Sequence, residues 1–312
     1  MSERKAINGQ AVGLMTVLCL IWGFQQIAIK AVAFDISPVL QIGLRSGIAA
    51  VLVGLLMVWR REPLAIKDGT WRPGLLIGVL FALEFLFMGE GMRYTTASHM
   101  AVFLYTAPFF AAIGLHLKLP EEKLSLLQWG GIGLAFIGVV AAFFGPDTRE
   151  ATREAPNILL GDFLGLLAGA CWGATTVIIR CTRLSDTSAT KTLFYQLVAA
   201  FVVLIVATFV LGQTAVNPTA QAWASVLFQG IIVAFATYLT WFWLLRNYLA
   251  SRLGVFSFMT PLFGIVFGVW LLHEPLDSSF IIGAALVSVG IIFVTGHDWI
   301  QQTLMAAQQK AK

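Results

Sequence analysis

The sequence RYTTASHMAVFLYTAPFFAAIGLHLKLPE, from Arg93 to Glu121, decides the fold because the chain contains it twice. The second copy, RNYLASRLGVFSFMTPLFGIVFGVWLLHE, runs from Arg246 to Glu274 at a constant offset of 153 residues. Arg93, Ala97, Ser98, Val102, Phe103, Pro108, Phe110 and Glu121 are identical in Arg246, Ala250, Ser251, Val255, Phe256, Pro261, Phe263 and Glu274. Each copy holds an apolar segment long enough to cross a bilayer, with a proline near its middle. A repeat at a fixed offset is typical of a duplicated membrane unit.

The composition also indicates a membrane protein. Of 312 residues, 58% are hydrophobic and only 12% are charged, about half the charged share of a soluble domain. The apolar residues fall in blocks of about 20, which is the length of a transmembrane helix. The basic residues lie between these blocks and form no patch, so we expect no nucleic-acid partner. Cys19, Cys171 and Cys181 lie in or beside apolar segments, which argues against a disulfide framework or a metal site.

We predict an all-α integral membrane protein with ten transmembrane helices, arranged as two inverted five-helix repeats around a central cavity. The predicted spans are roughly 11–32, 38–59, 73–92, 97–118, 125–144, 159–181, 189–211, 222–244, 249–271 and 278–296. The predicted domains are a first repeat at 1–144, a polar extracytoplasmic linker at 145–158, a second repeat at 159–296 and a cytoplasmic tail at 297–312.

The orientation follows from the basic residues of the loops. With the N-terminus inside, fifteen Lys and Arg residues lie on the cytoplasmic side and four lie outside, which predicts that both termini are cytoplasmic. Five spans is an odd number, so the second repeat lies upside down relative to the first. Two halves of one shape and opposite orientation can exchange conformations and open a central site to each side in turn.

The whole chain resembles a ten-span, EamA-type member of the drug/metabolite transporter superfamily. Three duplicated features carry the resemblance: the Trp-Gly pairs of spans 1 and 6, the mid-helix prolines, and a glutamate followed by a Gly-rich span in each half. They are Trp22-Gly23 and Trp172-Gly173, Pro108 and Pro261, and Glu121 and Glu274. The resemblance implies a bacterial inner-membrane exporter of amino acids or other small metabolites. It implies no cofactor, a small-molecule substrate and the lipid bilayer as partners, and a monomer as sufficient; the oligomeric state is not indicated.

Pro108 and Pro261 each remove one backbone hydrogen bond and free a carbonyl four residues earlier. In hydrocarbon such a carbonyl needs a partner or a water-lined cavity. A paired hinge for spans 4 and 9 is one interpretation, and a static kink is the other. Duplication at matched positions favours the hinge.

Two stripes of polar and aromatic residues, spaced four apart, mark one face of spans 1 and 6. The first stripe is Trp22, Gln26 and Lys30, and the second is Trp172, Thr176 and Arg180. We expect the two tryptophans, which lie well inside their spans, to line a cavity. For Lys30 and Arg180 we favour snorkelling to the membrane interface over a role in the cavity.

Glu84 is the most informative single residue, because it lies near the middle of span 3. An ionised carboxylate there costs roughly 2.5–3.5 kcal/mol, so it should face protein or water and have a partner. The candidate partners are Arg45 in span 2 and His99 in span 4. Two interpretations remain open, a site for a substrate amine or a proton, and a structural ion pair with Arg45. The repeat equivalent of Glu84 is Thr237, so the charge breaks the symmetry.

Two further features are expected to have structural roles. Glu90, three residues before Arg93, is expected to form an interfacial pair with it. Four glycines from Gly161 to Gly173 are expected to pack against another helix. The full set of candidate cavity residues is Trp22, Gln26, Arg45, Glu84, His99, Trp172, Thr176, Tyr195, Tyr238 and Trp241.

No catalytic motif is found, so we predict that the protein is not an enzyme and has no catalytic residues. The function predicted from the sequence is a secondary transporter that moves a small organic metabolite by alternating access. The alternative is an integral-membrane accessory or lipid-modifying protein without transport activity.

Overall fold

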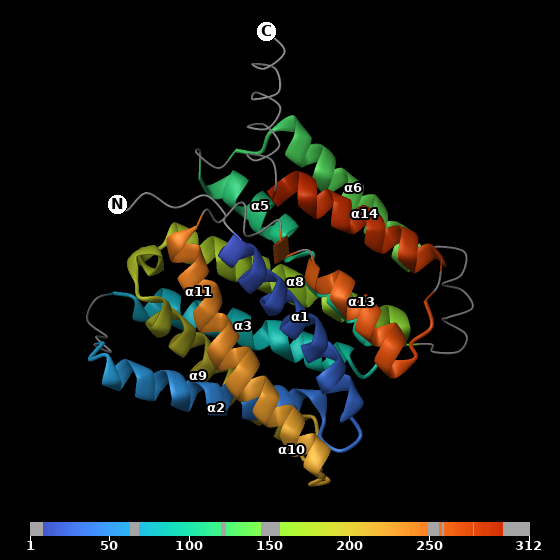
Figure 1. Ribbon diagram of the computed structural model, residues 1–312. Helices are drawn as coiled ribbons and strands as arrows, with labels where there is room; N and C mark the ends of the chain where they lie inside the picture. Colours follow the sequence, from blue (N-terminus) through green and yellow to red (C-terminus); the bar gives the residue numbers. More distant parts are fainter. Residues whose placement is uncertain are drawn as a thin grey trace.

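The computed structural model describes residues 9–62, 69–119, 123–144, 157–248, 256–257, 259–276 and 278–295 (Figure 1). The first half contains α1 Gly9–Ala31, α2 Pro38–Trp59, α3 Trp71–Gly91, α4 Ala97–Leu104, α5 Ala107–Lys118 and α6 Leu126–Phe144. The second half contains α8 Ile158–Cys181, η3 Arg183–Asp186, α9 Ala189–Val210, α10 Ala220–Leu227, η4 Phe228–Thr237, α11 Tyr238–Asn247, α13 Met259–Leu272 and α14 Ser278–Thr295.

These helices match the ten predicted spans. Within the described residues, seven helical segments are long and apolar enough to cross a membrane, counting α4 with α5 as one span and α10 with η4 and the start of α11 as another. Three further apolar helices, α6, α13 and α14, are shorter in the described ranges. Large apolar side chains such as Val58, Phe209 and Val210 are exposed on the outside of the bundle, as expected where the surroundings are lipid. The fold is an all-α membrane protein.

Equivalent helices of the two halves begin with the same local structure. Ser37 caps α2 and Ser188 caps α9, and in each case the serine side chain accepts a hydrogen bond from the backbone N–H three residues later. Each serine is the last residue of an Asp-x-Ser sequence, and the two sequences lie 151 residues apart. A capping hydroxyl satisfies one of the N–H groups that have no partner within the helix.

The contacts between the halves are also duplicated. Gly23 of α1 packs against Phe263 of α13, and Gly173 of α8 packs against Phe110 of α5, which is the repeat equivalent of Phe263. The glycines of α8 all face α3, α4 or α5, as expected for a small-residue packing face.

The last helix of each half pairs with the other. α6 and α14 lie side by side (Figure 1). Gly138 of α6 meets the Gly283 backbone, and Gly290 of α14 meets the Gly131 backbone. The two halves therefore contact each other through equivalent surfaces, as expected for an inverted repeat.

Two spans depart from the regular helices that were predicted. Span 4 is interrupted at Tyr105–Thr106, directly before Pro108, which lies in the first turn of α5. Span 8 contains ten residues of π-helix, η4, between two α-helical pieces. The repeat equivalent of span 8 is α3, which is α-helical throughout. Because π-helical segments often occur at functional sites, the asymmetry draws attention to the end of η4.

Candidate functional site

The charged centre of the molecule is formed by Arg45 of α2 and Glu84 of α3. Arg45 is only 1% exposed and Glu84 only 5% exposed. The Arg45 guanidinium lies 4.3 Å from the centre of the Phe85 ring and interacts electrostatically with Tyr238 and Glu84. Among the described residues Arg45 and Glu84 form no salt bridge within 4.0 Å, and Nε and Nη1 of Arg45 and Oε2 of Glu84 have no hydrogen-bond partner. The two side chains therefore attract each other without a direct salt bridge, and the choice between a solute site and a structural pair stays a prediction.

Two further buried polar atoms near this centre have no hydrogen-bond partner. They are Oε1 of Gln26 and Oγ1 of Thr260. Gln26 is placed beside α3 by a contact from its Nε2 to the sulfur of Met88, one turn after Glu84. Thr260 lies beside Tyr105, which in turn interacts electrostatically with Glu84. Since buried polar atoms nearly always have partners, this group has the capacity to bind a polar solute.

Aromatic side chains from both halves surround the charged centre. The Trp22 ring meets Tyr238 and Trp241 edge-on, at 6.5 and 5.8 Å between ring centres. On the other side, Tyr105 meets Trp172 edge-on at 5.2 Å. These rings come from α1, α8, α11 and the turn after α4. We name the central polar cluster as the group Trp22, Gln26, Arg45, Glu84, Tyr105, Trp172, Tyr238, Trp241 and Thr260.

The two irregular spans position this cluster. The turn at Tyr105–Thr106 places Tyr105 at the end of α4, and the Thr106 hydroxyl donates to the Phe103 carbonyl at 2.6 Å. At the end of η4, the Thr237 hydroxyl accepts a hydrogen bond of 2.8 Å from Nε1 of Trp22. The turn after α4 thus supplies the Tyr105 side chain, and η4 supplies the Thr237 hydroxyl, at the interface between the halves.

Comparison with known proteins settles the family. The EamA-like transporter family matches residues 10–144 and 159–296, which is nearly the whole chain. This chain belongs to the EamA-like transporter family. The resemblance found in the sequence is confirmed, and the protein is a multi-pass membrane transporter and not an enzyme.

Individual relatives of this EamA-like transporter cover almost its full length. It is 28% identical over 286 residues to "Uncharacterized transporter YoaV" of Bacillus subtilis, covering 91% of this chain and 96% of that protein. It is 24% identical over 295 residues to "Probable amino-acid metabolite efflux pump" of Escherichia coli, covering 92% and 95%. A solved structure titled "Crystal structure of protein" has the same fold, with a TM-score of 0.63 at 20% identity, covering 93% of this chain and 98% of that one.

His99, one of the two candidate partners of Glu84, is paired with another carboxylate instead. Its Nδ1 lies 2.9 Å from Oδ2 of Asp162 on α8, and its ring stacks on Phe280 at 3.9 Å. Asp162 was missed from the sequence. An acidic residue in the second turn of an otherwise apolar span was the feature that could have identified it.

Tyr195 also lies apart from the cluster's polar atoms. Tyr195 packs against Gly74 near the start of α3. Ten residues of helix separate Gly74 from Glu84, which is roughly 15 Å along the axis. The Thr176 hydroxyl donates to the Trp172 carbonyl of its own helix at 3.2 Å.

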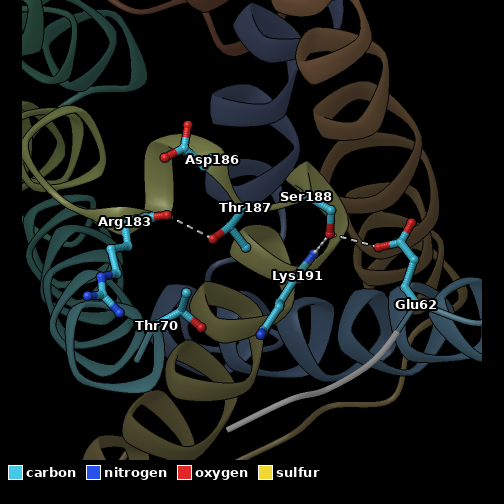
Figure 2. A pocket seen from close by; sticks show the side chains of 7 residues that line it. All are labelled: Glu62, Thr70, Arg183, Asp186, Thr187, Ser188 and Lys191. Carbon is cyan, nitrogen blue, oxygen red and sulfur yellow. Dashed lines mark hydrogen bonds between the residues drawn. The ribbon is translucent and has the colours of Figure 1, made fainter. Parts of the chain in front are cut away.

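A surface pocket of about 560 Å³ lies beyond Tyr195, between the end of α2 and the start of α9. Figure 2 shows the side chains that line it: Glu62, Thr70, Arg183, Asp186, Thr187, Ser188 and Lys191. Ser188 and Thr190 of the second half both donate to Oε2 of Glu62 in the first half, at 2.8 and 2.7 Å. This pocket marks a second place where the halves meet, away from the central polar cluster.

The charged ends of spans 1 and 3 have specific partners. Nζ of Lys30 donates to the backbone carbonyls of Met92 and Thr95, at the same end of α3 as the Glu90–Arg93 pair, so the expected interfacial position of Lys30 stays a prediction. Glu90 and Arg93 form the predicted interfacial pair, with 3.0 Å between Oε2 and Nη1.

In the part of the chain that the structure describes, no group of three His, Cys, Asp or Glu side chains is placed to hold a metal ion.

Proposed function

We propose that this EamA-like transporter is a secondary carrier that exports a small organic metabolite of the amino-acid type across the bacterial inner membrane by alternating access. The observation that carries the proposal is the central polar cluster, in which a guanidinium and a carboxylate are both buried without a direct bond to each other.

A zwitterionic solute matches the charges of this cluster. Its carboxylate would be bound by Arg45, because a guanidinium presents several donors in a geometry that suits carboxylates. Its ammonium group would be bound by Glu84. The surrounding rings of Trp22, Tyr105 and Trp172 suit the apolar remainder of an organic solute.

The cost of the buried charges supports a functional role. A charged residue in the membrane interior is unfavourable by about 2.5–3.5 kcal/mol, and such residues commonly mark substrate or ion pathways. A direct salt bridge between Arg45 and Glu84 would be a simpler structural use of the two charges, and it is not formed.

Alternating access is supported by the duplicated contacts between the halves and by the irregular span 4. The proposed hinge at Pro108 lies directly after the turn at Tyr105–Thr106. Pro261 lies in α13, and residues 256–257 before it are also helical. A single chain contains both halves of the central polar cluster, so a monomer is sufficient.

The proposed direction rests on relatives. Two relatives, from Escherichia coli and Salmonella typhimurium, are named "Probable amino-acid metabolite efflux pump". The distribution of Lys and Arg in the loops supports cytoplasmic termini.

Counterflow in proteoliposomes tests the proposal. Candidate solutes come from a screen for metabolite resistance in cells that overproduce the protein. We expect saturable counterflow for at least one amino acid or close derivative. Glu84→Gln and Arg45→Gln should each reduce its apparent affinity by about 30-fold or more, since loss of one partner of a buried charge pair costs 2–5 kcal/mol.

Glu90→Gln is the matched control, because it removes a partly buried carboxylate of the same helix, six residues after Glu84. Its pair with Arg93 is worth at most about 1 kcal/mol, so counterflow should persist. Counterflow that is unchanged by both Glu84→Gln and Arg45→Gln at every pH would refute the assignment of the site. Absence of flux for every solute from the screen would favour the alternative, an accessory or lipid-modifying protein.

A further inference from the structure

Helix α4 belongs to the first half but is held by side chains of the second half. It is only eight residues long, Ala97–Leu104, and every one of its residues is buried. Its N-terminus follows the α3–α4 connection, and its C-terminus leads directly into Tyr105 of the central polar cluster. Its length is about 12 Å, which separates the cluster from the outer end of the bundle.

Glu274, which lies between α13 and α14, binds the N-terminus of α4. One carboxylate oxygen accepts from the Ala97 N–H at 2.7 Å. The other accepts from the Ser98 N–H at 3.0 Å and from the Ser98 hydroxyl at 2.6 Å. A carboxylate is favourable here because helix N-termini carry unpaired N–H groups and a partial positive charge. These three charge-assisted bonds join the two halves.

Two further contacts from the second half hold the first turn of α4. Asp162 of α8 binds His99 through Oδ2 and accepts a hydrogen bond from the Thr95 hydroxyl through Oδ1. Phe280 of α14 stacks on the His99 ring with an interplanar angle of 6°. Together with Glu274, these side chains contact α4 from three separate elements of the second half.

Lys30 connects this set of contacts to α1. It donates to the carbonyls of Met92 and Thr95, just before α4, and interacts electrostatically with Glu274. The ammonium group thereby balances the carboxylate that binds the helix N-terminus.

We propose that α4 is the outer gate of the transporter and that Glu274 and Asp162 are its latch. Release of the latch frees α4 from the second half and opens the central polar cluster to the outer side. The turn at Tyr105–Thr106 separates α4 from α5, so α4 can move while α5 stays packed on α8. The latch is built from a few polar bonds, which can be exchanged between two states more readily than a continuous apolar interface.

This inference rests on the proposed alternating access, but its test needs no substrate. In a chain whose three cysteines are replaced by alanine, Thr106→Cys places a thiol of similar size at the inner end of α4. A membrane-impermeant maleimide is added from the outer side, and the rate of labelling is measured. Glu274→Gln and Asp162→Asn should each raise this rate about tenfold or more, because each removes charge-assisted bonds from the closed state.

Glu62→Gln is the matched control. Glu62 also accepts two hydrogen bonds across the halves, from Ser188 and Thr190, but at the other end of the bundle. Its variant should not raise labelling of Thr106→Cys from outside. Equal labelling with and without Glu274→Gln and Asp162→Asn, in protein that elutes as a single folded species, would overturn the inference.

A cross-link provides a second test that keeps the latch intact. A Cβ at Gly165 of α8 would lie 3.0 Å from the Cβ of Phe103 of α4, so the two helices need to separate by only about 0.5–1 Å to reach the Cβ–Cβ spacing of a disulfide. The double variant Phe103→Cys with Gly165→Cys should lose counterflow on oxidation and regain it on reduction, while each single variant is insensitive to oxidant. Continued counterflow in the cross-linked protein would refute a moving α4. Lack of flux in the unmodified transporter would instead count against the proposed function. The labelling experiment would still show whether α4 is a gate held by Glu274 and Asp162.

Discussion

Replacing Gly173 with alanine tests the close packing between the two halves. A Cβ at this position would lie 2.5 Å from the Cβ of Phe110, 2.8 Å from the Ala107 carbonyl oxygen and 2.9 Å from the Ala111 nitrogen. Two of these three atoms belong to the α5 backbone, so rotation of a side chain cannot relieve the clash. The helices α5 and α8 must move apart, and overpacking of this kind costs about 1–3 kcal/mol.

Gly133→Ala is the matched control for this prediction. Gly133 lies in the helical segment α6 and would have no atom within 4 Å of an added Cβ. Both substitutions gain the same helix propensity of about 1 kcal/mol, so the difference between the two variants isolates the clash at α5. That difference should be about 1–3 kcal/mol, with Gly133→Ala the more stable protein.

Thermal unfolding of the detergent-solubilised protein, followed by size-exclusion chromatography after heating, measures this difference. Each kcal/mol corresponds to roughly 1.5 °C for a chain of 312 residues, so Gly173→Ala should unfold roughly 1.5–5 °C below Gly133→Ala. Gly23→Ala should behave like Gly173→Ala, because a Cβ there would lie 2.8 Å from the Cβ of Phe263. Gly173→Ala and Gly133→Ala of equal stability would refute the close approach of α5 and α8.

Three further predictions follow from named contacts. Trp22→Phe keeps an aromatic ring but loses the hydrogen bond to η4, so the KM for counterflow should rise by about two- to tenfold; an unchanged KM would remove this contact from the site. Ser37→Ala and Ser188→Ala each remove a helix cap, so both should lower the unfolding free energy by about 0.5–2 kcal/mol in thermal assays, and a loss confined to one of them would contradict the equivalence of the caps. Pro108→Ala and Pro261→Ala should slow counterflow without lowering thermal stability if the prolines are hinges; unchanged rates would leave them as static kinks.

The architecture could be predicted from the sequence because the bilayer fixes the length of each span. Apolar blocks of about 20 residues gave helix positions within a few residues of those observed, except at the start of span 9, where most of residues 249–258 lie outside the described ranges. The 153-residue repeat then predicted two equivalent halves, and the paired contacts of Gly23 with Phe263 and Gly173 with Phe110 agree with it.

The irregular parts of spans 4 and 8 were only partly predictable. Pro108 indicated an interruption, because its ring disrupts the preceding turn. Nothing comparable marks η4 in the sequence. The Trp22 indole bonds to Thr237 at the end of that π-helix, so this contact depends on a neighbour more than 200 residues away.

The site residues that could be recognised within a single helix were predicted from the sequence. The residues that matter because of a contact with another helix were missed. Arg45 and Glu84 stood out because each is a charge inside an apolar span. The partners Asp162 and Thr260 did not, since contacts between helices of opposite halves leave no spacing pattern within either helix. Tyr105 and Thr260 could have been identified as site residues from the sequence, because each is a polar residue close to a mid-span proline.

The orientation of equivalent loops tests the inverted repeat most directly. Phe34, between α1 and α2, is fully exposed, and its repeat equivalent Ser185, between α8 and α9, is also exposed. With both positions replaced in turn by cysteine in the cysteine-free chain, an impermeant thiol reagent added to intact cells should label Phe34→Cys at once and Ser185→Cys only after permeabilisation. Labelling of both positions from the same side would show that the halves are parallel and would contradict the architecture on which alternating access depends.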